Sequence, residues 1–423
     1  MKVFKFGGAS VKTADAVKNV KYIVDRYQHD DLFVVISAMG KTTNAMESIV
    51  SALYDQNDAL FLELVADRKD FHWSIMDALF DDHNHPVFAE TNALFDELIA
   101  LKEERMVENY NFQYDQIVAF GEILSTKIVS AYLASFRDDV CWKDARTFIR
   151  TNDNYRAAEV DWDKTQELID VVVQSVKCKV LITQGFIGHT KEGITTTLGR
   201  EGSDFTAAIL AFCTNAESVT IWKDVPGMLN ADPRWFDYTE KLDSISYREA
   251  IELSYFGASV IHPKTIKPLQ NKGIRLFVKS FIDPEGAGTI IQESIENDHL
   301  IPSFIFKINQ VLMTITPKDF SFIMEDNLSH IFKNISRSGG HINIMQNSAV
   351  SFTGCLDIDP LQLNKLVDLL SDDYSVKYNN DLELVTIRHF DQETIDRVTK
   401  GREMLMEQKT RQTARIVMKK IER

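Results

Sequence analysis

The hydrophobic pattern of the first fifty residues alternates between short apolar runs and helical spacing. Lys2–Phe6 predicts a short strand, and after Thr13 apolar residues recur at the spacing of one helix face. Leu32–Ser37 is an uninterrupted apolar run, as expected of a strand buried on both faces of a parallel sheet. Because Glu47 follows Asn44 by three residues, as in a capping box, we expect the next helix to begin there.

The alternation of strand-like and helical stretches continues to about residue 280. It predicts the α/β fold class, with a mostly parallel sheet and helices on both faces. The further runs predicted to be strands are Lys179–Thr183, Val219–Trp222 and Arg275–Lys279, and the helical stretches between them are Ser203–Phe212 and Tyr247–Tyr255.

The stretch from about residue 48 to residue 111 contains no glycine and is rich in Leu, Ala, Asp and Glu. This composition predicts a helical insertion in the α/β domain. His83 and His85 lie within it, but no carboxylate at helical spacing completes a metal site around them. We therefore interpret them as solvated turn residues.

Turn-forming residues are concentrated at residues 283–288, where we expect the first domain, residues 1–293, to end. Beyond it the pattern predicts a small unit over residues 301–378, in the order strand, helix, strand, strand, helix. Part of this order repeats over residues 379–423, so we expect a truncated second unit there. The predicted elements are Ile305–Thr316, Asp326–Ser338, His341–Met345, Ala349–Leu356 and Pro360–Leu370, then a strand ending at Arg388, a helix over Gln392–Gln408 and a strand over Thr413–Met418.

The formal net charge of -15 excludes two classes of main activity. A strongly acidic chain repels both nucleic-acid phosphates and anionic lipid surfaces, so we expect no nucleic-acid and no membrane partner. Small charged ligands stay compatible with the sequence, since a local cluster of Lys and Arg can override the net charge. Apolar runs such as Leu32–Ala38 are shorter than the ~18 residues that a membrane helix requires.

The four cysteines lie far apart in the chain, with no Cys-x-x-Cys spacing. This pattern, with no signal peptide ahead of it, predicts reduced thiols in a cytoplasmic protein rather than disulfides or a metal site. The cysteines are Cys141, Cys178, Cys213 and Cys355.

The sequence Lys5-Phe6-Gly7-Gly8-Ala9-Ser10 leaves the first predicted strand directly. Backbone N–H groups without Cβ shielding, together with a lysine ammonium, would face a ligand at the end of that strand. A phosphate cradle and a plain turn are both compatible with this segment alone. A P-loop is excluded, because Val35 occupies the place of its first glycine ahead of Gly40-Lys41-Thr42.

Two later segments combine glycine or turn residues with charged groups. Thr195–Asp204 holds Gly199 and Gly202 and leads into an apolar helix, whose N-terminal end favours anions. Arg200 in this segment suits a carboxylate, although Ser203 or Asp204 could simply cap the helix. Trp222–Arg234 follows another strand, where loops of α/β sheets line ligand clefts.

Together these segments resemble the aspartate kinases of the amino-acid-kinase family, in order and approximate spacing. The C-terminal part resembles the paired ACT domains of those enzymes, so the resemblance covers nearly the whole chain. The matching segments are Lys5–Val11, Ser37–Asn44, Phe120–Glu122, Thr183–Phe186, Thr197–Asp204, Trp222–Arg234 and Phe256–Pro263.

The resemblance implies two catalytic residues. Lys5 would contact the phosphates of ATP and stabilise the transferring phosphoryl group, and Asp204 would orient Lys5 and the substrate amine. It also implies a nucleotide site formed by Lys5, Gly7, Gly8, Ser10, Lys223, Asp224, Asp232, Arg234 and Ser259.

For the acceptor substrate, L-aspartate, the resemblance implies a site with charges opposite to its own. Glu122 would lie near the α-ammonium and Arg200 would bind the α-carboxylate. The implied substrate residues are Ser37, Thr43, Glu122, Phe186, Arg200 and Ser203. The implied product is 4-phospho-L-aspartate, on the way to lysine, threonine and methionine.

The implied reaction needs no general base. A β-carboxylate with an ordinary pKa of ~3.9 is already an anion at neutral pH, so its attack on the γ-phosphorus requires only positioning and charge neutralisation. Mg²⁺ would arrive with ATP rather than at a metal site of the protein. His262 is then a structural turn residue.

Three positions depart from the usual pattern of the family, namely Ala9, Leu229 and Ser259. They motivate an alternative in which the chain senses amino acids with weakened or lost catalysis. A second alternative is a family member with another acceptor, such as glutamate or a nucleotide.

The ACT-like tail implies regulation and assembly. We expect a homodimer joined beyond about Ile301, with lysine or threonine bound between the ACT-like units. The effector segments would be residues 320–326 and 341–351.

Overall fold

The structure is a computed structural model that describes residues 1–104, 109–236, 238–258, 261–298, 301–319 and 321–420. The chain divides into two compact units, each with a hydrophobic core of its own. The first unit comprises Met1–Met228, Lys241–Ser254 and Ser259–Asp298, and the second comprises Leu229–Glu240, Tyr255–Ala258 and His299–Arg423.

The first unit is built on one sheet with the strand order β3-β4-β2-β1-β7-β9-β10-β8. All neighbouring pairs from β3 to β9 are parallel, and β10 runs antiparallel to β9. The mostly parallel sheet predicted from the apolar runs is confirmed. The strands are β1 (Lys2–Phe6), β2 (Leu32–Ile36), β3 (Val140–Trp142), β4 (Val180–Gln184), β7 (Ser218–Lys223), β8 (Ser244–Ser246), β9 (Arg275–Ser280) and β10 (Thr289–Gln292).

Four central strands of this sheet end at nearly the same level. Phe6 at the end of β1 pairs with Ile36 of β2 and with Trp222 of β7, and Ile36 pairs with Gln184 of β4. Because parallel strands send their following segments out at one edge, the loops after these strands converge there.

Helices cover both faces of the sheet, as predicted. Phe4 and Phe6 of β1 belong to one core with residues of the helices α1, α3 and α5. The alternate side chains of β1 point to the other face, where α7 packs against β1. The helices of the first unit are α1 (Ala14–Asp25), α2 (Thr42–Tyr54), α3 (Asp58–Leu79), α4 (Pro86–Glu104), α5 (Tyr110–Ala134), α6 (Trp162–Ser175), α7 (Gly202–Thr214), α8 (Tyr247–Phe256, whose last two residues belong to the second unit) and α9 (Pro263–Lys272).

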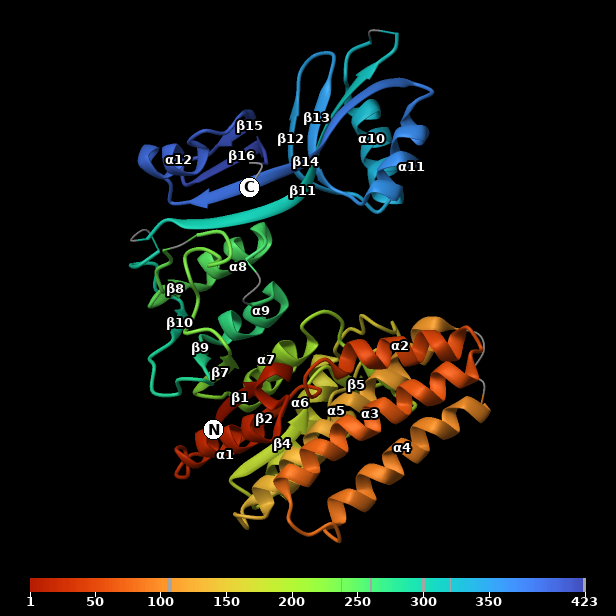
Figure 1. Cartoon of the computed structure of the whole chain (residues 1–423). Helices are drawn as coiled ribbons and strands as arrows, with labels where there is room; N and C mark the ends of the chain where they lie inside the picture. The colour runs from red at the N-terminus through yellow and green to blue at the C-terminus, as the bar shows by residue number, and fades with distance from the viewer. Residues whose placement is uncertain (105–108, 237, 259–260, 299–300, 320, 421–423) are drawn as a thin grey trace. The chain divides into compact units, whose positions relative to one another are not determined.

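The predicted helical insertion consists of α3, α4 and the neighbouring parts of α2 and α5. These helices lie side by side in Figure 1 and share a core around Phe61, Phe95 and Leu98. His85 belongs to the turn before α4, and His83 stacks on the ring of Phe88.

Among the described residues, α5 alone is long and apolar enough to cross a bilayer. Of its most apolar 18-residue window, 78% is buried inside the protein, which identifies α5 as a core helix. It also contains two buried carboxylic acids, Asp115 and Glu122.

The second unit holds a six-stranded antiparallel sheet in the order β12-β13-β11-β14-β16-β15. The helices α10 and α11 contribute to one of its cores, and α12 contributes to another. The elements are β11 (Ser303–Pro317), α10 (Glu325–Arg337), β12 (His341–Asn347), β13 (Phe352–Asp357), α11 (Pro360–Leu370), β14 (Tyr374–Arg388), α12 (Gln392–Thr399), β15 (Met404–Lys409) and β16 (Thr413–Lys419).

Two long strands, β11 and β14, connect the two halves of this sheet. The first part of β11, Ser303–Lys307, pairs with the last part of β14, and the register shifts after Lys307. Asn309 and Asp381 adopt left-handed backbone conformations near this irregularity, with φ of 56° and 57°. The segment after residue 382 therefore pairs with the first residues of the predicted ACT-like unit over residues 301–378.

The predicted helix over Gln392–Gln408 is wrong in its second half. The helix α12 ends at Thr399, and Gly401 with φ of 71° lies in the turn that follows. The strand β15 then pairs antiparallel with β16. Sheet pairing with a distant segment overrides the local helical pattern here.

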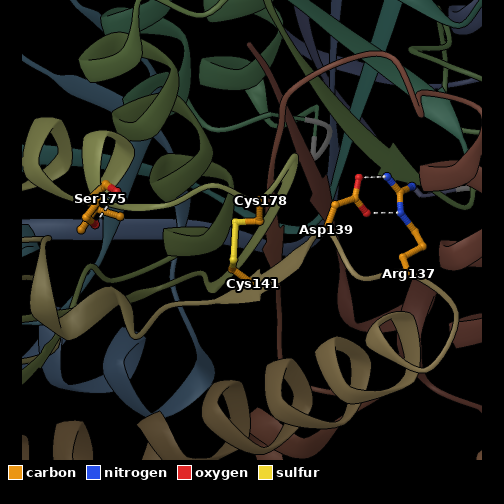
Figure 2. The surroundings of a disulfide bond; sticks show 6 residues. Arg137, Asp139, Cys141, Ser175 and Cys178 are labelled. Atoms are coloured by element: carbon orange, nitrogen blue, oxygen red, sulfur yellow. Dashed lines mark hydrogen bonds and ion pairs between the residues drawn. A yellow bond between two sulfur atoms is a disulfide. The ribbon is translucent and has the colours of Figure 1, made fainter.

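The prediction that all cysteines are reduced is also wrong. Figure 2 shows a disulfide between Cys141 of β3 and Cys178, which stands just before β4. The parallel pairing of β3 and β4 brings the Cα atoms of the two cysteines to within 5.8 Å of each other, although 37 positions separate these cysteines in sequence. Cys213 and Cys355 are buried thiols, and burial raises the pKa of each to about 12.

Candidate active site

A cavity of about 540 Å³ lies in the first unit, where the loops after β1, β2, β4 and β7 converge. Its lining combines four basic side chains with four acidic ones. The lining residues are Lys5, Ser37, Thr43, Glu47, Tyr114, Glu122, Arg156, Phe186, Gly199, Arg200, Glu201, Gly202, Ser203, Asp204 and Lys223.

The basic end of the cavity is organised by Asp204. Lys5 Nζ lies 2.6 Å from Asp204 Oδ1, and Lys223 Nζ lies 3.6 Å from Asp204 Oδ2. Burial raises the pKa of Asp204, but the Lys5 and Lys223 ammonium groups outweigh it and hold the pKa below its ordinary value. The carboxylate stays ionised and keeps two ammonium groups at one place, a suitable environment for phosphate oxygens.

The first turn of α7 forms one wall of the cavity through Gly202, Ser203 and Asp204. The loop after β4 approaches this turn so closely that side chains are excluded at two glycines. A Cβ atom on Gly185 would lie 2.4 Å from Ser203 Cβ, and one on Gly202 would lie 2.6 Å from Phe186 Cδ2. Phe186 itself adopts a left-handed conformation with φ of 72°. Such a conformation is costly for a bulky residue, which is typical of a functional site.

Glu122 on α5 is a second buried acid of the cavity, with 2% of its surface exposed. Burial raises its pKa to about 8, although the N–H group of Ala38 and the charge of Lys5 act in the opposite direction. Its Oε2 accepts no hydrogen bond from the described residues. A carboxyl group in this position is suited to a ligand that brings a positive charge.

The loop after β2 supplies Ser37 and Thr43, and α5 holds it in place. Ser125 Oγ donates a hydrogen bond of 2.7 Å to the carbonyl oxygen of Ser37. Gly8 contacts the same loop, since a Cβ atom there would lie 2.7 Å from the carbonyl oxygen of Gly40. The glycine turn after β1 is thus required for the close approach of two loops.

Comparison with known proteins agrees with this geometry. The model of the amino acid kinase family matches residues 1–280. Lysine-sensitive aspartokinase 3 of Escherichia coli (strain K12) is 33% identical over 358 residues, which is 84% of this chain and 78% of that protein. The chain belongs to the amino acid kinase family, among its aspartokinases.

Solved aspartokinase structures match nearly the whole chain. The structure of Escherichia coli aspartokinase III with lysine and aspartate has a TM-score of 0.82 at 28% identity, covering 99% of this chain and 95% of that one. The same enzyme with aspartate and ADP matches with a TM-score of 0.79 at 28% identity, covering 99% and 96%. A bifunctional aspartokinase/homoserine dehydrogenase of Arabidopsis thaliana is 27% identical, and the chain spans 41% of its length.

All residues that the aspartokinase resemblance implied for catalysis and substrate binding line this one cavity, together with Lys223 of the implied nucleotide site. These are Lys5, Ser37, Thr43, Glu122, Phe186, Arg200, Ser203, Asp204 and Lys223. Their individual roles stay predictions.

The other residues predicted for the nucleotide do not line this cavity. Gly7 lies beside Lys5, since a Cβ atom there would be 3.5 Å from the Lys5 ammonium, and Ser10 bonds the carbonyl oxygen of Trp222. Asp224 follows the lining residue Lys223 in sequence, and Gly8 packs against the loop that holds Ser37. Asp232 and Arg234 belong to the second unit, where they form an ion pair of 2.5 Å with each other. Ser259 lies outside the described residues.

Four charged or aromatic lining residues were not found from the sequence, namely Glu47, Tyr114, Arg156 and Glu201. Glu47 was noted only as part of a helix start. Tyr114 and Glu122 are eight residues apart on α5, a spacing that places them near one helix face. This spacing could have identified Tyr114 as a further residue of the site. Arg156 stands in a loop, and its sequence offers no such signal.

Proposed function

We propose that this chain transfers the γ-phosphate of ATP to the β-carboxylate of L-aspartate, giving 4-phospho-L-aspartate. The observation behind this proposal is one cavity that holds the Lys5, Asp204 and Lys223 cluster together with Glu122 and Arg200. Aspartate brings one ammonium and two carboxylates, and this lining offers a counter-charge to each of them.

The two ends of the cavity would have different tasks. Glu122 and Arg200 would hold the α-ammonium and α-carboxylate, which leaves the β-carboxylate directed toward Lys5 and Lys223. These ammonium groups would neutralise the charge on the phosphoryl oxygens during in-line transfer. No protein base is needed, because the β-carboxylate is already ionised at neutral pH. Mg²⁺ would be bound through the phosphates of ATP.

Trapping of the acyl phosphate tests this proposal. Purified protein with MgATP, L-aspartate and hydroxylamine is expected to form aspartyl hydroxamate and ADP in equal amounts. L-glutamate and uridine monophosphate serve as controls for another acceptor. Aspartate binding without ADP formation would favour the alternative of an amino-acid sensor, which Ala9 and Leu229 motivate.

Arg200 is expected to act on the substrate rather than on ATP. Replacing Arg200 by alanine should raise the KM for aspartate by about 10- to 100-fold, since a charge-assisted contact is worth roughly 1.5–3 kcal/mol, and change the KM for ATP little. Arg275→Ala is a matched control, because Arg275 starts β9 at the opposite edge of the sheet. A rise mainly in the KM for ATP would instead assign the loop of Arg200 to the nucleotide site.

We infer further that the protein is a cytoplasmic homodimer, joined through the second unit and inhibited by lysine or threonine. The strand β12 is an outer strand of its sheet and exposes Met345, so a second copy can pair with it. Light scattering at micromolar concentration should give twice the chain mass of 48.3 kDa. A monomer would refute the assembly, and activity unchanged by millimolar lysine and threonine would refute the regulation.

A further inference from the structure

We propose that Arg156 is a second arginine of the acceptor site, binding the α-carboxylate beside Arg200, and that Asp115 positions it. This inference rests on the proposed function, because it takes the acceptor to be an α-amino dicarboxylate. It begins from the backbone of Arg156, which is left-handed with φ of 68° although the residue has a side chain. Such a conformation persists only where surrounding contacts hold it, and it is common at ligand sites.

The contact that holds this backbone is a buried carboxylate. Asp115 on α5 is fully buried, and both of its oxygens accept the N–H of Arg156 at 3.1 Å. The same oxygens accept from Thr197 N at 2.8 Å and from Thr197 Oγ1 at 2.7 Å. Burial raises the pKa of Asp115 to about 6 against these hydrogen bonds. A buried acid is costly, and here it ties together two loops.

These two loops are the ones that bring Arg156 and Arg200 to the cavity. Thr197 stands three residues before Arg200, and its carbonyl oxygen accepts the N–H of Ala158 at 2.9 Å. Gly199 is equally close, because a Cβ atom there would lie 3.1 Å from the carbonyl oxygen of Arg156. Asp115 therefore fixes both arginines relative to one scaffold, the core helix α5.

The side chain of Arg156 lines the cavity and is supported from one side. Its guanidinium carbon lies 4.4 Å from the centre of the Tyr114 ring, and Tyr114 Oη donates to Glu47 Oε1 at 2.8 Å. Among the described residues, the guanidinium donates one long side-chain hydrogen bond, of 3.5 Å, to Asn111 Oδ1. Stacking on an aromatic ring orients a guanidinium while its N–H donors stay available in the ring plane.

The balance of acidic and basic side chains in the cavity lining supports a role for Arg156 in substrate binding. The lining acids are Glu47, Glu122, Glu201 and Asp204, and the lining bases are Lys5, Lys223, Arg200 and Arg156. Because burial raises the pKa of Glu122 to about 8, the three bases other than Arg156 would only match the three other acids, in a cavity that must receive a substrate with two carboxylates. A second guanidinium in the lining, besides that of Arg200, gives the cavity a positive charge for the substrate and offers a fork suited to a carboxylate.

The left-handed backbone makes a decisive variant available. Glycine adopts such a conformation without strain, so Arg156→Gly should fold as well as the wild type and melt at an equal or higher temperature. We expect the same variant to weaken aspartate binding about tenfold or more by calorimetry. The control ligand is aspartate α-amide, which lacks the α-carboxylate and should bind the wild type and the variant with equal affinity.

Asp115→Asn tests the positioning role, because the amide keeps the shape but loses the charge. It should weaken aspartate binding at least as much as Arg156→Gly does, because Asp115 holds the loops of both arginines, and the double variant Asp115→Asn/Arg156→Gly should bind no more weakly than Asp115→Asn alone. Additive losses would overturn the positioning role. Arg156→Gly with unchanged aspartate affinity, or with an equal loss for the α-amide, would overturn the assignment of Arg156. Because these are binding measurements, a wild type that binds aspartate but forms no hydroxamate refutes the kinase function separately. A wild type that does not bind aspartate overturns both.

Discussion

Replacing Lys5 by methionine is expected to lower kcat by about 10²- to 10³-fold, with a much smaller change in either KM. The reason is that a preorganised charge at the transferring group is typically worth about 3–4 kcal/mol, and it acts mainly in the transition state. Steady-state rates of ADP formation with saturating aspartate and ATP measure this directly. Lys18→Met, on the exposed side of α1, should leave the rate unchanged.

A loss of activity in Lys5→Met could also arise from misfolding, since Asp204 is buried and would lose its ion pair of 2.6 Å. Lys223 remains at 3.6 Å, so we expect a folded but less stable protein. The double variant Lys5→Met/Asp204→Asn removes the uncompensated charge and should recover the melting temperature without recovering kcat. Near-wild-type turnover in a folded Lys5→Met protein would exclude Lys5 from catalysis.

Aspartate binding is expected to depend strongly on pH through Glu122. Its pKa of about 8, raised by burial, means that the empty site holds a neutral acid at pH 7. The substrate ammonium favours the carboxylate form, so binding releases a proton. Higher pH therefore favours binding, and the dissociation constant should fall about tenfold per pH unit from pH 6 to pH 7.5 and then level off near pH 8.

Calorimetry in buffers of different ionisation enthalpy measures this proton release, which should approach one proton per aspartate at pH 7. In Glu122→Gln the release and the pH dependence should both vanish, and affinity at pH 8 should fall by on the order of 10²-fold, since a buried charge pair is lost. A pH-independent dissociation constant in the wild type would show that Glu122 does not face the substrate ammonium.

The elements that the sequence predicted correctly are those whose cause is local. The strand β2 is a continuous apolar run, and β1, β4, β7 and β9 are short segments rich in apolar residues, as expected of strands in a parallel sheet. The helix α1 follows from its Thr13 cap, whose side chain accepts the N–H of Ala16 at 3.2 Å, and from one apolar face. Lys5 and Asp204 reach the cavity for a similar reason, since each stands at the end of a strand or the start of a helix.

The features that were missed depend on contacts between distant segments. The local pattern of residues 392–408 favours a helix, yet pairing with β16 makes its second half a strand. Cys141 and Cys178 meet only because β3 lies beside β4.

The sequence by itself determined the α/β class, the central strands and the charged residues that follow them, because hydrophobic periodicity and turn chemistry act within a few neighbouring positions. Only the tertiary structure decided that Arg156 joins the cavity, since its left-handed backbone depends on a buried carboxylate 41 positions earlier in the chain. It also decided that Leu229–Glu240 belongs to the second unit, where Trp235 stacks on Phe306. The physical reason is the same in both cases: burial of a charge or a ring is stabilising only with partners that folding brings from far along the chain.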